Sequence, residues 1–411
     1  MTERKDIFSI LPLWFGVAAL VLSPTQWALR LPGDIHLSPA DPLIWLAFIL
    51  LVISASWQRN RALLRPPPLL LIVFILLTFL SLLAAENKLA AIKEFIQYTE
   101  YFAAGFVVFR GMTANGFSMR RFAMLFSAAA TVVIFCGLFQ YFTPSVPNFE
   151  VRGTFGNHNV YGGFLALTLP LLYGACLEKD FRRPVRTWLA ITIAAGTITV
   201  LSGGAWVAIL TAFGVVSVLK SQRAFLVFAA TAVLLMAWVL PALPRTNPEV
   251  WLDSTAFYES DGAAAQRYPE WQAATGMAIE HPLLGVGAGN YQRRIGMFYG
   301  IIPNRPESSV PDSQNLYLVL ASSLGFPAML AFAGALIFFL RAAAEGALKN
   351  TKQEKGIAAG LVGSMVGFGV SSIWSPLLVR GIGLPLTALM VLAILSGPHK
   401  SDDRNKQYEN T

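Results

Sequence analysis

The sequence predicts an all-α fold: a polytopic bundle of about twelve transmembrane helices with one long external loop that contains short helices. Of the 411 residues, 55% are hydrophobic and only 13% are charged, whereas a water-soluble domain carries about a quarter charged residues. The mean hydropathy is +0.56. Apolar runs of roughly 17–25 residues, the length that crosses a bilayer, recur from end to end.

The spans are expected between charged or Pro/Gly-rich breaks. The first is interpreted as a retained helix and not a signal peptide, because it has no small-residue cleavage site and many similar runs follow. The predicted spans lie near 7–24, 41–57, 68–84, 91–109, 122–142, 160–177, 185–201, 204–219, 224–241, 315–340, 356–374 and 379–397.

The distribution of Lys and Arg predicts the orientation. If the N-terminus is cytoplasmic, the inside segments hold 21 of the 31 cations, and the short loops alternate between rich and poor in cations. The positive-inside rule therefore places both termini in the cytoplasm. The net charge of +8 is explained by loops facing anionic lipid, so no nucleic-acid partner is expected.

Four regions follow from this topology. Residues 1–241 form spans one to nine, 242–313 a periplasmic loop, 314–398 spans ten to twelve, and 399–411 a cytoplasmic tail. A loop as long as 242–313 without a function is uncommon. Within it, a helix is expected from about Ala263 to Glu280, with Trp271, Ala274 and Ala278 on one face, and the turn with Pro282 and Gly285 ends it.

Polar residues gather at three external places. The loop "VRGTFGNHNVYGG" at 151–163 offers Arg152, Asn157, His158 and Asn159, with glycines that let a ligand approach the backbone. The alternative is a structural turn with Asn159 as the N-cap of the next helix.

The second place is the long loop, with Arg267, Arg293 and Arg294. A guanidinium matches phosphate oxygens, but each of these arginines could also be a solvated loop charge. Because Arg293 and Arg294 are adjacent, one of them at most is expected to face a site.

The third place is "PDSQN", at the start of span ten. Asp312 and Ser313 are interpreted as helix caps. Gln314 and Asn315 are then surplus at a lipid-facing helix start, so they are expected to face protein or a wet cavity, with Asn315 contacting sugar or phosphate.

Charged residues inside or beside spans are a further indication, because they are costly in lipid. Lys93 and Glu94 lie near an outer end, where snorkelling is the alternative. Arg380, at the outer start of the last span, could likewise snorkel or could join a phosphate site. Glu100 lies deeper. By contrast, the two cysteines and four histidines have no metal-ligand spacing, so neither a metal nor a cofactor is expected.

Four stretches in this order resemble the O-antigen ligase and O-antigen polymerase family of inner-membrane glycan enzymes. They are "RGTFGNHNVYGGFLALTLPLL" (152–172), "LSGGAWVAIL" (201–210), "EHPLLGVGAGNYQ" (280–292) and "SQNLYLVLASSLGFPAML" (313–330). The resemblance implies a bacterial inner-membrane, GT-C-type glycosyltransferase that needs no metal. It implies transfer of a glycan from an undecaprenyl-pyrophosphate donor to an acceptor hydroxyl, on a lipid or a saccharide, at the periplasmic face, as in lipopolysaccharide or exopolysaccharide synthesis.

In such an enzyme, Arg152, Arg267 and Arg293 would hold the phosphates, with Asn157, Asn159 and Asn315 as further substrate contacts. The chain departs from the family pattern at two positions. Gln314 stands where a histidine is typical, and Gly203 stands where an arginine is common. A neutral amide cannot accept a proton near neutral pH, so Gln314 is expected to bind substrate. His158 is the one nearby substitute base that the sequence offers, and a structural turn histidine is the alternative.

Other functions stay open at this stage. A ligase and a polymerase cannot be separated by these residues. The chain could also be a transporter of small anions, although transporters place their cations in broken helices near the midplane, or an inactive scaffold of a polysaccharide-assembly complex.

Overall fold

A computed structural model describes residues 7–31, 35–57, 64–147, 150–243, 263–299, 313–349 and 354–397. Within the loop 242–313, residues 244–262 and 300–312, Asp312 among them, lie outside the described residues, and so does the predicted tail 399–411. In the described part the fold is helical, as predicted, apart from one hairpin. Its strands β1 (Leu29–Leu31) and β2 (Ile35–Leu37) pair antiparallel, with Leu29 opposite Leu37.

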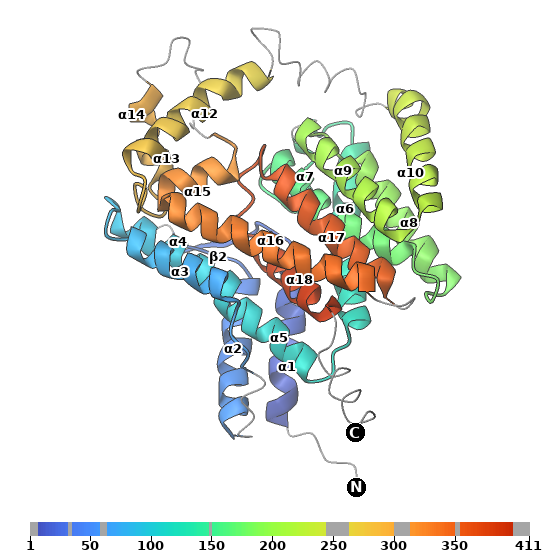
Figure 1. The fold of residues 1–411 in the computed structure, drawn as a ribbon, viewed down its shortest axis with the longest axis horizontal. Coiled ribbons are helices and arrows are strands. Elements are labelled where there is room, and N and C mark those ends of the chain that lie inside the picture. The colour runs from blue at the N-terminus through green and yellow to red at the C-terminus, as the bar shows by residue number, and fades with distance from the viewer. Residues whose placement is uncertain are drawn as a thin grey trace, which may run out of the picture.

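A helix lies at every position where the sequence predicts a span (Figure 1). In chain order the helices up to the long loop are α1 (Ile7–Leu22), α2 (Ala40–Trp57), α3 (Leu69–Ser81), α4 (Lys88–Thr99), α5 (Phe106–Ala114), α6 (Met119–Phe142), α7 (His158–Cys176), α8 (Arg183–Ile198), α9 (Gly203–Lys220) and α10 (Gln222–Leu234). After it come α12 (Ala263–Glu280), α13 (Tyr291–Arg294), α14 (Gly296–Tyr299), α15 (Leu316–Leu324), α16 (Phe326–Lys349), α17 (Lys355–Ser371) and α18 (Gly383–Ser396).

Five described helices are long and apolar enough to cross a membrane: α6, α7, α9, α10 with its extension to Val239, and α16. Five more apolar helices are shorter: α1, α2, α3, α17 and α18. The predicted number of about twelve spans is therefore not confirmed. Three of the predicted spans are not regular α-helices: the one near 224–241 continues beyond α10 as a π-helix over Leu235–Val239. The π-turn Glu100–Gly105 interrupts the one near 91–109, and Gly325 divides the one near 315–340.

The bundle is built around α7, the most buried of the five candidate spans. Helix α17 packs against α7 and α9, and α16 joins α17 to α3 and α18. Glycines allow the α7–α17 approach: a Cβ on Gly174 would lie 2.7 Å from the Cα of Gly360, and one on Gly360 would lie 2.9 Å from the Cα of Leu171. Small residues at helix contacts are the usual means of close packing in membranes.

The connecting segments gather at two ends of the bundle. At one end, Lys220 pairs with Glu178 (3.5 Å), Glu178 accepts from the Gly356 N–H (2.5 Å), and Arg120 donates to the Asp180 carbonyl (3.0 Å). All of these lie in or next to segments predicted to be cytoplasmic. We call this the Glu178 end. The grouping agrees with the predicted alternation of loops, while the orientation itself stays a prediction.

At the opposite end, which we call the cavity end, the segments predicted to be external meet. Thr25 donates to the Thr154 carbonyl (3.3 Å), and Thr154 donates to the Pro24 carbonyl (2.6 Å). The turn after α12 docks on α15, where the Val286 N–H donates to the Ser322 carbonyl (2.9 Å). In Figure 1, α12, α13 and α14 lie beyond α15, next to the start of α4.

Candidate functional site

The cavity end contains a hollow of about 770 Å³. Four separate segments line it: α4, the turn and helix at 289–293, the first turns of α15, and the segment 376–380 between α17 and α18. Its polar lining consists of Asn87, Lys93, Glu94, Gln97, Tyr98, Tyr291, Gln292, Arg293 and Arg380. A volume of this size accommodates a substrate of several sugar or phosphate units.

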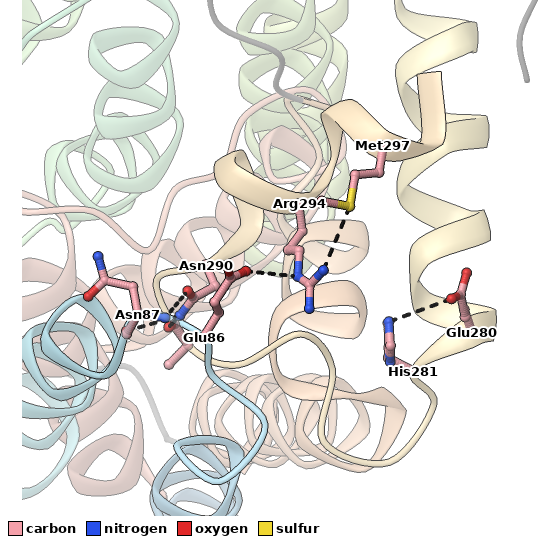
Figure 2. Close-up of polar contacts among 8 residues, drawn as sticks. Glu86, Asn87, Glu280, His281, Asn290, Arg294 and Met297 are labelled. Atoms are coloured by element: carbon pink, nitrogen blue, oxygen red, sulfur yellow. Dashed lines mark hydrogen bonds and ion pairs between the residues drawn. The ribbon is translucent and has the colours of Figure 1, made fainter. Parts of the chain in front are cut away.

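A pair of asparagines joins α4 to the turn that precedes α13 (Figure 2). Asn87 caps α4, accepting from the Ala90 N–H. The buried Asn290 accepts from the Asn87 N–H (2.8 Å) and donates to the Asn87 carbonyl (3.3 Å) and the Ala288 carbonyl (2.8 Å). Because the Asn290 amide bonds to the backbone of both segments, the two walls of the cavity are held in a fixed relation.

The glycine turn that carries Asn290 requires glycine. Gly285, Gly287 and Gly289 have φ angles of 63°, 91° and 66°, which side-chain-bearing residues rarely adopt. A Cβ on Gly287 would lie 2.5 Å from the Cβ of Ala85, and one on Gly289 would lie 2.7 Å from the Ala90 carbonyl. The stretch "GVGAGN" therefore brings backbone directly against the start of α4.

Three cations line this cavity, each from a different segment. Arg293 lies in α13, is exposed, and forms no ion pair with a described residue. Lys93 lies on α4 and is half-buried. Arg380 lies before α18 and pairs with Asp41 (3.4 Å). With Glu94 as the one carboxylate among the described lining residues, the cavity attracts anions.

Glu94 and Tyr98 are neighbours on one face of α4. The Tyr98 hydroxyl donates to Glu94 Oε1 (2.7 Å), and the Gly289 backbone is a further donor to this carboxylate. One turn away, Gln97 donates to the Tyr101 hydroxyl (2.7 Å).

Behind Arg380 lies a buried polar cluster. Asp41, at the start of α2, holds Arg380, and the Trp45 indole donates to Glu100 Oε2 (3.2 Å). Glu100 is 6% exposed and is the first residue of the π-turn, a helix irregularity that is frequent at functional sites. Glu100 therefore has a partner inside the bundle and does not face lipid.

Comparison with known proteins finds a family match for the part of the chain that contains Arg293. Residues 188–333 match the family model described as O-antigen ligase. Residues 188–333, called the O-antigen ligase segment below, are therefore similar to this family. No curated protein matches the chain. The matched segment runs from α8 into α16, and thus includes the glycine turn and α15, while α4 and Arg380 lie outside it.

In this O-antigen ligase segment, the start of α15 differs from the prediction. Asn315 is the N-cap and accepts from the N–H groups of Tyr317 (3.0 Å) and Leu318 (3.1 Å). Ser313 is not the cap: it is buried, its N–H donates to the Tyr291 hydroxyl (3.1 Å), and its carbonyl accepts from the Trp271 indole (2.8 Å). The polar stretch is thereby tied to α12 and to the cavity wall.

The capping role gives a testable expectation. Asn315→Ala is expected to lower the free energy of unfolding by about 0.5–2 kcal/mol, because the first turn of α15 loses its acceptor. Asn315→Asp keeps an acceptor and serves as the matched control. Denaturation in detergent measures both. Unchanged stability of Asn315→Ala with weaker donor binding would instead favour the sugar or phosphate contact that the sequence predicts.

Gln314 has a φ of 48°, in the left-handed region. Among the described residues, Glu354 is the only other non-glycine with a positive φ. Such a conformation costs about 1–2 kcal/mol and persists where surrounding structure imposes it. Gln314 does not line the cavity, but Leu316, two residues later, does. Its predicted role as a substrate contact stays a prediction.

The loop at 152–159 lies beside a second, smaller hollow of about 400 Å³, lined by Trp27, Gln140 and Arg152 among others. Arg152 donates to the Gly156 carbonyl (3.0 Å). Arg152 lines this smaller hollow and Arg293 lines the other, so the two arginines do not share a cavity. The two hollows are neighbours, since a Cβ on Gly381 would lie 2.8 Å from the Phe155 ring.

The remaining predicted residues of this loop lie at the start of α7. Asn157 is the N-cap, accepting from the Val160 N–H (2.8 Å), so the alternative that made Asn159 the cap is wrong by two residues. His158 and Asn159 are the first two residues of the helix. Neither is among the residues that line the two hollows.

Helix α12 has the predicted bounds, Ala263–Glu280. Ala274 and Ala278 are buried, as expected for one inward face. Arg267 is partly buried on this helix and does not line the cavity. Of the predicted site residues, Arg293 alone lines the larger cavity.

Some of the residues at the cavity carry a signal in the sequence and others do not. Lys93, Glu94 and Arg380 stand out as charges at the ends of spans, which is the signal that could have placed them in a site. Tyr98 and Gln292 have no such mark. Asn290 follows the last glycine of "GVGAGN" and could have been singled out there.

Proposed function

We propose that this protein transfers a glycan from an undecaprenyl-pyrophosphate donor to an acceptor hydroxyl at the periplasmic face of a bacterial inner membrane. The observation that carries the proposal is the cavity that Arg293, Lys93 and Arg380 line together. It borders the O-antigen ligase segment, whose family acts as glycan ligases or polymerases.

The reaction class matches this charge arrangement. The donor arrives activated, because its pyrophosphate is a leaving group on which negative charge grows as the bond to the sugar breaks. Preorganised cations at that place stabilise the transition state, and removing one such group typically costs about 10²–10³ in rate. Arginine is suited to this because its planar fork matches phosphate oxygens.

The acceptor is expected to enter beside the donor. A ligase would take a hydroxyl of a lipid or other acceptor, and a polymerase a hydroxyl of a second lipid-linked glycan. Both reactions need the same cationic place for the pyrophosphate. The proposal therefore covers lipopolysaccharide-type ligation and exopolysaccharide-type polymerisation alike.

A transfer assay with the purified protein tests the function. In vesicles that contain the undecaprenyl-pyrophosphate glycan, the protein is expected to move the glycan to an acceptor and release undecaprenyl pyrophosphate in equal amount. Protein-free vesicles are the control. Absence of transfer with lipid and saccharide acceptors, together with movement of small anions across the same vesicles, would replace this proposal by transport.

A further inference from the structure

Glu94 differs from the other acidic residues near the cavity in what it contacts. Asp41 pairs with Arg380, and Glu86 pairs with Arg294 (3.4 Å). Glu94 forms no ion pair with a described residue, although it lines a cavity that contains three cations. It is therefore not explained as a structural counter-ion.

The donors that Glu94 uses are neutral. They are the Tyr98 hydroxyl at 2.7 Å and the Gly289 backbone. An ionised carboxylate has about four acceptor positions, so these two leave capacity for a further donor. Since Glu94 lines the hollow, that donor can come from a bound molecule. A carboxylate held by a phenol and by backbone is fixed in position but keeps its ability to take a proton.

We propose that Glu94 is the general base that takes the proton from the acceptor hydroxyl. This inference rests on the proposed function. The acceptor O–H proton passes to the Glu94 carboxylate, and the acceptor oxygen forms a bond to the anomeric carbon of the donor sugar. The bond from that carbon to the pyrophosphate oxygen breaks, and undecaprenyl pyrophosphate leaves with the electron pair. The proton then passes from Glu94 to water.

The placement of the other groups is consistent with this role. Arg293 and Glu94 line the same cavity from α13 and α4, two segments that the Asn87–Asn290 contact joins, so pyrophosphate and acceptor would bind in one hollow. Gln314, an amide, cannot accept the proton, and His158 does not line the cavity. The other charged or titratable groups of the lining are Lys93, Tyr98, Tyr291, Arg293 and Arg380, none of them a carboxylate.

The alternative is a positioning role, in which Glu94 merely holds the glycine turn against α4. The two roles predict different behaviour of Glu94→Gln, whose amide keeps the shape and an acceptor oxygen but cannot serve as a base. A base should contribute about 10²–10⁴ to the rate, and its loss should change the pH dependence. A positioning group should lower donor binding and reduce the rate equally at every pH.

The experiment measures single-turnover transfer in vesicles with saturating donor, from about pH 5 to about pH 9. We expect the rate of the unaltered protein to fall at low pH, and we expect Glu94→Gln to slow transfer by about 100-fold or more and to remove that fall. Glu94→Asp, which keeps a carboxylate, is expected to transfer faster than Glu94→Gln and to show the fall in rate at low pH again. Affinity for undecaprenyl pyrophosphate alone, measured in parallel, should stay within about threefold. Glu345→Gln, at an exposed carboxylate at the far end of α16, is the control and should match the unaltered protein.

Each other result overturns the inference. Full activity of Glu94→Gln, or a slower rate with an unchanged pH profile, would assign Glu94 a positioning role or none, while leaving the proposed function intact. Loss of affinity for undecaprenyl pyrophosphate in both Glu94→Gln and Glu94→Asp would likewise assign Glu94 a positioning role. Absence of transfer by the unaltered protein would overturn the proposed function itself, and this inference with it.

Discussion

Arg293→Ala is expected to reduce glycan transfer by about 100-fold or more. The Arg293 guanidinium lines the cavity and is not held by a carboxylate of the described residues. It can therefore bind a phosphate. Because the charge on the leaving pyrophosphate grows in the transition state, the loss should fall on the maximal rate as well as on donor affinity.

The neighbouring arginine provides the matched control. Arg294 is not among the residues that line the cavity, and it contacts Glu86 and the Met297 sulfur (Figure 2). Its ion pair is largely exposed, and such pairs contribute about 0–1 kcal/mol. Arg294→Ala should thus keep nearly full activity, and Arg293→Lys should recover part of it. Equal losses in Arg293→Ala and Arg294→Ala would contradict the role proposed for Arg293, because only one of the two lines the cavity.

Gly287→Ala is expected to abolish donor binding by displacing the glycine turn. Its φ of 91° is unfavourable for alanine, and the new Cβ would lie within 2.6 Å of three atoms of Ala85. A left-handed conformation and an overpacked contact together cost roughly 2–5 kcal/mol. Since the three atoms are the N, Cα and Cβ of Ala85, they cannot rotate away, and the turn with Asn290 and Arg293 must move.

A glycine nearby in sequence separates this effect from a general effect of alanine. A Cβ added to Gly296, at the start of α14, would meet no atom within 4 Å, and the residue has no positive φ. Gly296→Ala should therefore retain both stability and donor binding. Thermal unfolding in detergent and undecaprenyl-pyrophosphate binding measure both variants. Normal binding by Gly287→Ala would mean that the turn does not position the cavity.

The helix positions could be predicted because the signals are local. Helix α12 has the bounds that its composition indicates, and Pro282 and Gly285 follow its end as expected. The break at Gly325 could not be predicted, because it depends on a distant segment. There the Phe326 N–H donates to the Pro282 carbonyl (2.9 Å). Docking of the turn after α12 thus divides what looks like one apolar span.

The cap of α15 could not be predicted for the same reason, because it too depends on distant segments. The sequence offers several residues able to cap α15, and the composition favours the first of them, Asp312 and Ser313. The structure uses Asn315, because the side chains of Tyr291 and Trp271 engage the backbone of Ser313 instead. Contacts between residues more than twenty positions apart therefore decide which side chain begins the helix.

The candidate site could be predicted only in part. Residue type, a place in the long loop and the resemblance together indicate Arg293, and it does line the cavity. The same reasoning expects Arg152 to act with it, but Arg152 lies at the smaller hollow. Lys93 and Glu94 lie about 200 positions before Arg293 in the chain, and only the packing of the glycine turn on α4 brings them together.

The most direct test of the proposed site asks where the donor binds. An undecaprenyl-pyrophosphate glycan with a photoreactive group beside the pyrophosphate is crosslinked to the protein in vesicles, and the labelled peptides are identified by mass spectrometry. We expect labelling of α4 within Lys88–Thr99 and of residues 289–293, suppressed by unlabelled undecaprenyl pyrophosphate. Specific labelling confined to residues 150–157, or to the Glu178 end, would contradict the site.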